Sequence, residues 1–121
     1  MEKSLSCIDI IQLYQDKYNF IHTNKLNEFW AMERLFRIGI PEEVLNSKEP
    51  KYVFRVLHEI GHCETFHEKQ FKVQREFLAT QWAIDKCKEL QIQPDKNHDL
   101  WQHYILQFTK AKDKSKYILK W

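Results

Sequence analysis

Residues 51–66 read KYVFRVLHEIGHCETF, and positions 58–62 of this stretch form the pattern His-Glu-x-x-His. Apolar side chains recur along the segment at the spacing of one helix face, which predicts a helix. A step of four residues advances a helix by slightly more than one turn, so His58 and His62 leave the same face, one above the other. Two imidazoles in this arrangement can chelate a single Zn²⁺.

Glu59 follows the first histidine and projects beside the predicted metal. A carboxylate in this position can take a proton from a water molecule at the metal and pass it to a leaving amine. Gly61 costs the helix about 1 kcal/mol, and we interpret it as a place where another segment approaches the metal helix closely. The alternative interpretation is a surface helix that carries two incidental histidines.

Two histidines do not complete a catalytic site, so a third ligand must come from elsewhere and leave one position open for water. The downstream candidates are Glu64, His67, Glu68, Glu76, His98 and His103. Glu64 points about 200° around the helix from His62. A compact pattern would need histidine at position 68 and a turn glycine where Thr65 stands. Glu76 fits better, because alanines follow it at i+3 and i+7 and let a second helix pack tightly on the first. The alternative for Glu76 is a solvated helix carboxylate.

Residues 58–62 (HEIGH) and 76–83 (EFLATQWA) together resemble the ImmA/IrrE-type zincin metallopeptidases. The resemblance covers about residues 51–90, and Trp82 stands where that family usually has phenylalanine. It implies a minimal gluzincin fold with zinc bound by three residues and one general base. These are the ligands His58, His62 and Glu76 and the base Glu59. Members of this family are commonly encoded on phages or mobile elements, and several cleave a repressor or another regulator.

Apolar periodicity and turn residues predict the remaining elements of residues 1–121. We expect a helix capped by Ser4 or Ser6, then a hairpin made of a strand at 19–24, a turn at 25–27 and a strand that ends at Pro41. One helical turn at 41–45, helices at 51–66, 71–90 and 98–112, and a Lys-rich tail should follow. Residues 28–35 are also compatible with a helix. The expected fold class is α+β: a single, minimal zincin-like domain, mostly helical, with a small antiparallel sheet or hairpin packed on the metal-binding helix.

Residues 35–40 alternate between apolar and other side chains, which is typical of a half-buried strand. In zincins an edge strand beside the metal helix holds an extended peptide by strand addition. If this segment is that edge, Arg37 is placed to touch substrate, although a charge that protects the edge explains it equally well.

Composition limits the possible functions further. The 121 residues carry 19 Lys and Arg against 17 Asp and Glu, a net charge of +2 that excludes a polyanion binder driven by bulk charge. No apolar run is long enough for a membrane span or a signal peptide. The three cysteines lack paired spacing and predict reduced thiols in the cytoplasm. His67, His98, His103 and Tyr104 are polar candidates for substrate or oxyanion contacts, each more typical of an ordinary surface or core residue.

These observations predict a cytoplasmic zinc metallopeptidase that hydrolyses a peptide bond in a protein substrate such as a regulator. Its water would be activated by zinc and by Glu59 as general base. The alternative is a catalytically inactive, zincin-like module that binds a protein partner. A weaker alternative is a small nucleic-acid-binding regulator that uses the Lys-rich tail with Tyr117 and Trp121. Nucleic acid is an unlikely partner by charge, and we expect no membrane partner.

Overall fold

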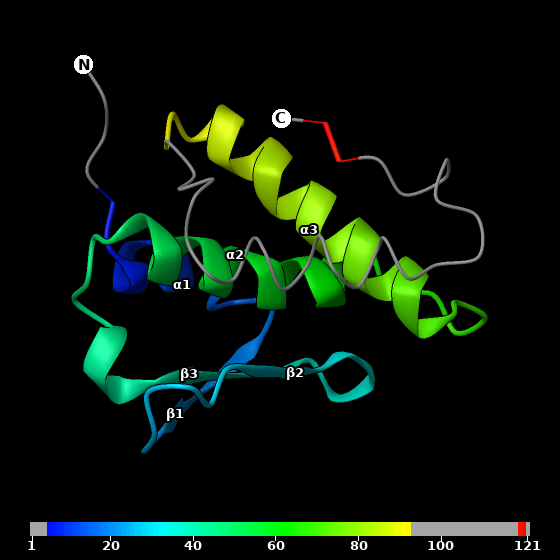
Figure 1. The fold of residues 1–121 in the computed structure, drawn as a ribbon. Helices are drawn as coiled ribbons and strands as arrows, with labels where there is room; N and C mark the ends of the chain where they lie inside the picture. Colours follow the sequence, from blue (N-terminus) through cyan, green and yellow to red (C-terminus); the bar gives the residue numbers. More distant parts are fainter. Residues whose placement is uncertain (1–4, 93–118, 121) are drawn as a thin grey trace.

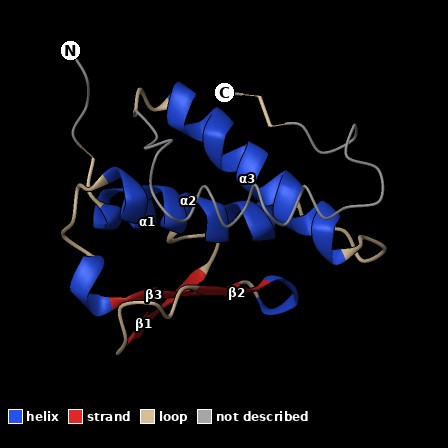
Figure 2. Cartoon of the chain, in the orientation of Figure 1, coloured by secondary structure: helices blue, strands red, loops and turns tan. Residues whose placement is uncertain are grey.

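A computed structural model describes residues 5–92 and 119–120 of the chain. Within these ranges the chain forms three α-helices, a three-stranded sheet and two short 3-10 helices (Figures 1 and 2). The elements are α1 (Cys7–Tyr14), β1 (Asn19–Thr23), β2 (Trp30–Met32), η1 (Glu33–Leu35), β3 (Arg37–Pro41), η2 (Glu42–Val44), α2 (Pro50–Glu64) and α3 (Lys72–Glu89). The expected α+β class is confirmed.

The HExxH helix, α2, is the central element of the fold. Figure 1 shows it between α3 on one side and the sheet on the other, with α1 beside it. Its buried side chains include Phe54, Leu57 and Ile60, which pack with Ile10 of α1 and Ile38 of β3 in one core cluster. Because α2 is covered on both sides, polar residues in its middle are removed from water along with the apolar ones.

Gly61 is a point of close approach between α2 and α3. A Cβ atom built at this position would lie 2.7 Å from the backbone oxygen of Ala79 and 3.2 Å from its Cα. Ala79 and Ala83 are fully buried on the facing side of α3. The interpretation of this glycine as a site of close helix approach is therefore confirmed, and so is the tight packing expected from the small residues of α3.

We expect Gly61→Ala to lower the free energy of unfolding by about 1–2 kcal/mol. Overpacking a closed interface costs about 1–3 kcal/mol, whereas alanine gains about 1 kcal/mol over glycine in a helix. The overpacking term dominates here because the contacted atoms belong to the backbone of Ala79 and cannot rotate away. Urea unfolding measures the change, and Lys88→Ala at an exposed position of α3 is the control. A Gly61→Ala protein as stable as wild type would contradict the expectation.

The sheet has the strand order β1-β3-β2 and is mixed. β2 and β3 form an antiparallel hairpin, and its turn is η1 together with Phe36, whose φ of 55° is left-handed. β1 pairs with β3 in parallel, so the expectation that residues 19–24 form a hairpin with the strand before Pro41 is wrong. Residues 25–27 lie in the expected turn, and η2 is the expected helical turn.

The expectation that residues 35–40 form a sheet edge is wrong, because β3 is hydrogen-bonded on both sides. Its residues from Ile38 to Pro41 are all buried, and the ring of Trp30 covers Gly39 from the neighbouring strand. The alternating pattern therefore belongs to a strand covered on both faces, which the sequence does not distinguish from a half-buried one. Arg37 is exposed at the start of this central strand, so neither role suggested for it at an edge applies.

Ser6 caps α1 through a capping box with Asp9, as expected for one of the two serines. Ser4, the predicted helix at residues 98–112 and most of the Lys-rich tail lie outside the described residues. In the part of the chain that the structure describes, none of the helices has the length and apolar character of a membrane span.

Candidate metal centre

The three predicted metal ligands meet between α2 and α3. The Nε2 atoms of His58 and His62 lie 3.1 Å apart. Glu76 reaches across from α3, with Oε2 3.1 Å from His58 Nε2 and Oε1 3.3 Å from His62 Nε2. Two imidazole nitrogens therefore lie side by side, and each contacts a different oxygen of the same carboxylate. All of these atoms can bind a cation through a lone pair.

The spacing of these atoms fits a tetrahedral ion. Zinc binds imidazole nitrogen and carboxylate oxygen at about 2.0–2.2 Å, which places the ligand atoms of a regular tetrahedron about 3.3–3.6 Å from one another. The observed separations of 3.1–3.3 Å are close to these values. Three protein ligands leave the fourth corner open, as catalytic zinc sites require.

Helix packing explains why these residues meet. His58 and His62 lie one turn apart on the face of α2 that turns toward α3, so both follow from the helix itself. Glu76 is near the start of α3 and three residues before Ala79, whose backbone contacts Gly61. The absence of a side chain at position 61 thus brings α3 close enough for its carboxylate to reach both imidazoles.

Electrostatics prepare His58 and Glu76 to bind a cation. Burial lowers the pKa of His58 to about 4, so this imidazole is neutral and keeps its lone pair at physiological pH. Burial alone would raise the pKa of Glu76, but the contacts of its carboxylate with the imidazoles of His58 and His62 hold the pKa well below its usual range. The side chains of His58, His62 and Glu76 are only 2%, 11% and 19% exposed. A negatively charged carboxylate therefore sits in a largely dry site beside neutral imidazole nitrogen.

Glu59 belongs to the same buried group. One ligand atom from each of His58, Glu59 and His62 lies within 4.8 Å of the others, so this group can hold a metal ion. Glu76 has the more direct contacts to both imidazoles, which favours Glu76 over Glu59 as the third ligand. Burial raises the pKa of Glu59 to about 7, a value at which a carboxyl group can both accept and release a proton near neutral pH.

Thr80 is a further residue of the site that sequence reasoning missed. It is fully buried on α3, and its hydroxyl donates a hydrogen bond to the backbone oxygen of Glu76 at 2.7 Å. The Thr80 hydroxyl oxygen also lies 3.3 Å from His58 Nδ1 and can accept the proton of that nitrogen. Nε2 of His58 is then the nitrogen with the free lone pair. The sequence could have indicated Thr80, because position 80 is one helical turn after Glu76 and lies on the same helix face.

Glu33 is the second residue that sequence reasoning missed. It lies on η1, and its Oε1 is 3.8 Å from Nδ1 of His62. No pattern in the sequence links positions 33 and 62, because they approach each other only when the β2–β3 hairpin packs on α2.

The other candidate ligands do not join the site. Glu64 accepts hydrogen bonds from Lys17 and Tyr18 on the chain that enters β1, as expected for a residue on another face of the helix. His67 and Glu68 are exposed in the turn after α2. His98, His103 and Tyr104 lie outside the described residues.

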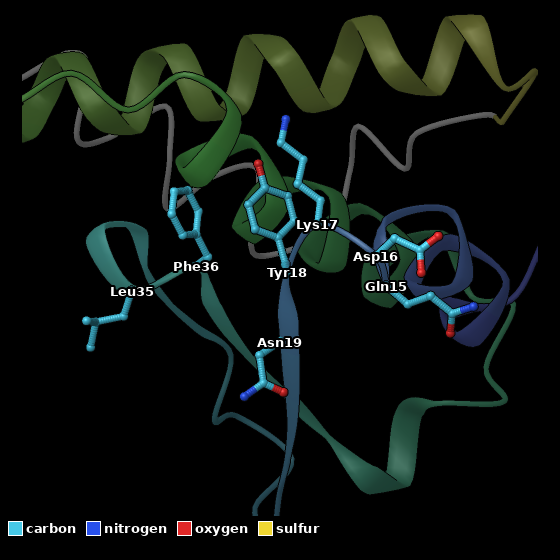
Figure 3. A pocket seen from close by; sticks show the side chains of 7 residues that line it. All are labelled: Gln15, Asp16, Lys17, Tyr18, Asn19, Leu35 and Phe36. Carbon is cyan, nitrogen blue, oxygen red and sulfur yellow. The ribbon is translucent and has the colours of Figure 1, made fainter.

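An open pocket of about 380 Å³ lies at the junction of α1, β1 and η1 (Figure 3). Figure 3 shows the rings of Tyr18 and Phe36 beside each other, with their centroids 6.2 Å apart. Lys17 forms an ion pair with Glu64 of α2. None of the residues that line the pocket is a candidate metal ligand. The pocket and the His-Glu-His group therefore share no residues.

All three cysteines are free. Cys7 and Cys87 are buried and Cys63 is half-buried, and burial raises the pKa of each thiol to about 12. These residues behave as small apolar side chains of the core rather than as ligands of the candidate centre.

No family model, curated protein or solved structure matches the chain. The geometry and chemistry of the His58, His62 and Glu76 cluster, with Glu59 beside it, therefore carry the functional assignment.

Proposed function

We propose that the protein is a zinc-dependent metallopeptidase with His58, His62 and Glu76 as ligands. The observation that carries the proposal is the convergence of two imidazole nitrogens and one carboxylate, with contacts of 3.1–3.3 Å, between two helices. Two imidazoles and one carboxylate are a donor set typical of catalytic zinc. The resemblance of residues 51–90 to ImmA/IrrE-type zincins points to the same chemistry.

Zinc in this site would polarise the scissile carbonyl group and acidify a water molecule. Glu59 then serves as general base: it accepts the proton of the attacking water and returns it to the leaving amine. Its burial and its pKa of about 7 support both transfers, because the carboxyl group exchanges a proton readily near neutral pH. The low exposure of the ligands excludes competing water from the reacting atoms.

The edge strand β2 supports a peptide as the substrate. β3 is central, so the sheet has β1 and β2 as its edges, and β2 is an edge that packs against α2. An extended peptide can add to such an edge through backbone hydrogen bonds, which gives affinity without requiring a particular sequence. Substrate binding by strand addition was expected at residues 35–40. We propose that Trp30–Met32, immediately before η1, binds the extended peptide instead.

Metal content tests the proposal. We expect the protein to hold about one zinc ion per chain, the stoichiometry of a single catalytic site. The His58→Ala variant should lose this zinc, because two protein ligands do not complete the site. His67→Ala, at an exposed histidine, is the matched control and should retain it. Wild-type protein that stays zinc-free after incubation with equimolar zinc would show that the proposal is wrong.

The intact Glu59 favours the enzyme over a catalytically inactive binding module, since a purely structural metal site has no use for a base. Zinc binding without cleavage of any peptide would identify the binding module instead. The free thiols support the cytoplasmic location that the sequence predicts.

A further inference from the structure

We propose that Glu33 is a positioning residue that holds the His62 ring for metal binding by accepting a hydrogen bond from its Nδ1. The inference rests on the proposed zinc site and extends it to the β2–β3 hairpin. It starts from an atom whose hydrogen-bonding capacity is unused: Nδ1 of His62 is buried and has no hydrogen-bond partner.

A histidine that binds a metal through Nε2 carries its proton on Nδ1. In metalloproteins this N–H is almost always donated to a carboxylate, a backbone carbonyl or water, which fixes the ring orientation and makes the ligand more basic. A buried N–H without a partner costs about 1–3 kcal/mol. His62 therefore needs an acceptor at Nδ1 if its Nε2 is a ligand.

His58 has a hydrogen-bond partner at its Nδ1, whereas His62 has none. His58 has Thr80 at its Nδ1, at a distance of 3.3 Å, and the Thr80 hydroxyl is already donated to Glu76. The hydroxyl is thereby oriented as an acceptor. The two imidazoles have their Nε2 atoms at the same candidate site, but only the Nδ1 of His58 has its partner within hydrogen-bond range.

Glu33 has the position and chemistry to complete the pair. Its Oε1 lies 3.8 Å from Nδ1 of His62, less than 1 Å beyond a good hydrogen bond. Its side chain is only 20% exposed. A shift of less than 1 Å at this carboxylate oxygen would close the gap.

The other charged groups near His62 have different partners or positions. Glu76 faces Nε2 at 3.3 Å, on the metal side of the ring. Glu59 is adjacent to the site, in the place of the general base. Glu33 comes from the opposite direction, on the turn between the edge strand β2 and the central strand β3. The hairpin that would bind the peptide thus also supplies support for a metal ligand.

The test measures zinc affinity rather than activity. We expect Glu33→Ala to weaken zinc binding about 10–100-fold, the usual effect of removing an outer partner of a metal-binding histidine. Glu33→Gln should recover part of the loss, because its amide oxygen accepts the same hydrogen bond without the charge. Competition with a chromophoric chelator gives the dissociation constants. The visible absorption of the Co²⁺-substituted protein should also shift in Glu33→Ala, since the ring of a ligand changes orientation.

Glu42→Gln is the matched control, because Glu42 begins η2 as Glu33 begins η1 and lies exposed. It should bind zinc as wild type does. Unfolding of the metal-free proteins separates positioning from support of the fold: Glu33→Ala should unfold within about 0.5 kcal/mol of wild type, the range of ordinary surface changes. Wild-type zinc affinity and an unchanged Co²⁺ spectrum in Glu33→Ala would overturn the inference while leaving the proposed zinc site intact. Failure of the wild-type protein to bind zinc would overturn both.

Discussion

Replacement of Glu59 by Gln is expected to lower the rate of peptide cleavage by about 10²–10⁴-fold, the usual contribution of a general acid–base group. Glutamine has the shape of glutamate, but it can neither accept the proton of the attacking water nor return one to the amine. Zinc content should stay at the wild-type level, because the ligand atoms of His58, His62 and Glu76 already contact one another without Glu59. Loss of activity with retention of metal is the signature of a base rather than a ligand.

A peptide mixture derived from a proteome, read by mass spectrometry for new termini, measures cleavage by a peptidase of any sequence preference. Glu68→Gln is the control, since Glu68 is an exposed carboxylate in the turn just after the same helix. It should cleave at the wild-type rate. Cleavage by Glu59→Gln at the wild-type rate would exclude Glu59 as the base, and loss of zinc from this variant would identify Glu59 as a ligand.

Replacement of Glu76 by Ala is expected to weaken zinc binding by more than about 100-fold, because removing an outer partner of a ligand alone costs about 10–100-fold. Alanine removes a carboxylate that lies 3.1 Å from His58 Nε2 and 3.3 Å from His62 Nε2. The two histidines that remain cannot hold the ion against a competing chelator. Chelator competition and zinc analysis of the purified protein measure the effect.

The matched control is Glu89→Ala, at an exposed glutamate in the last turn of the same helix. It should bind zinc as wild type does. Glu76→Asp offers a finer test, because aspartate keeps the charge but retracts the carboxylate by one methylene, so we expect intermediate affinity. Unchanged zinc content in Glu76→Ala would show that the third ligand is another residue, and Glu59 would be the next candidate.

Much of the candidate site follows from local helix geometry. His58 and His62 share a face of α2 because four residues make about one turn, and this holds wherever the helix lies. Glu76 followed from the small residues after it and from Gly61, whose close contact with Ala79 the structure confirms. In each case a short stretch of sequence is enough to explain where the side chain lies.

The sheet was less predictable. The pattern of residues 35–40 describes which side chains are covered, and it does not say which strands lie on either side. β3 became the central strand because β1 pairs with it in parallel, across a connection that contains β2. Such pairing depends on segments distant in sequence. The sequence pattern therefore predicted an edge strand at residues 35–40, whereas Trp30–Met32 forms an edge of the sheet.

The sequence by itself determined the helix that carries His58, Glu59 and His62 and the second helix that carries Glu76, because periodicity and side-chain size act within a few residues of one another. Only the tertiary structure decided that β2 is the edge strand beside α2 and that Glu33 lies against His62. These two features depend on how the hairpin packs on the helix. The sequence shows only that the hairpin and the helix each have an apolar face. Many relative arrangements of the two elements would bury these faces equally well.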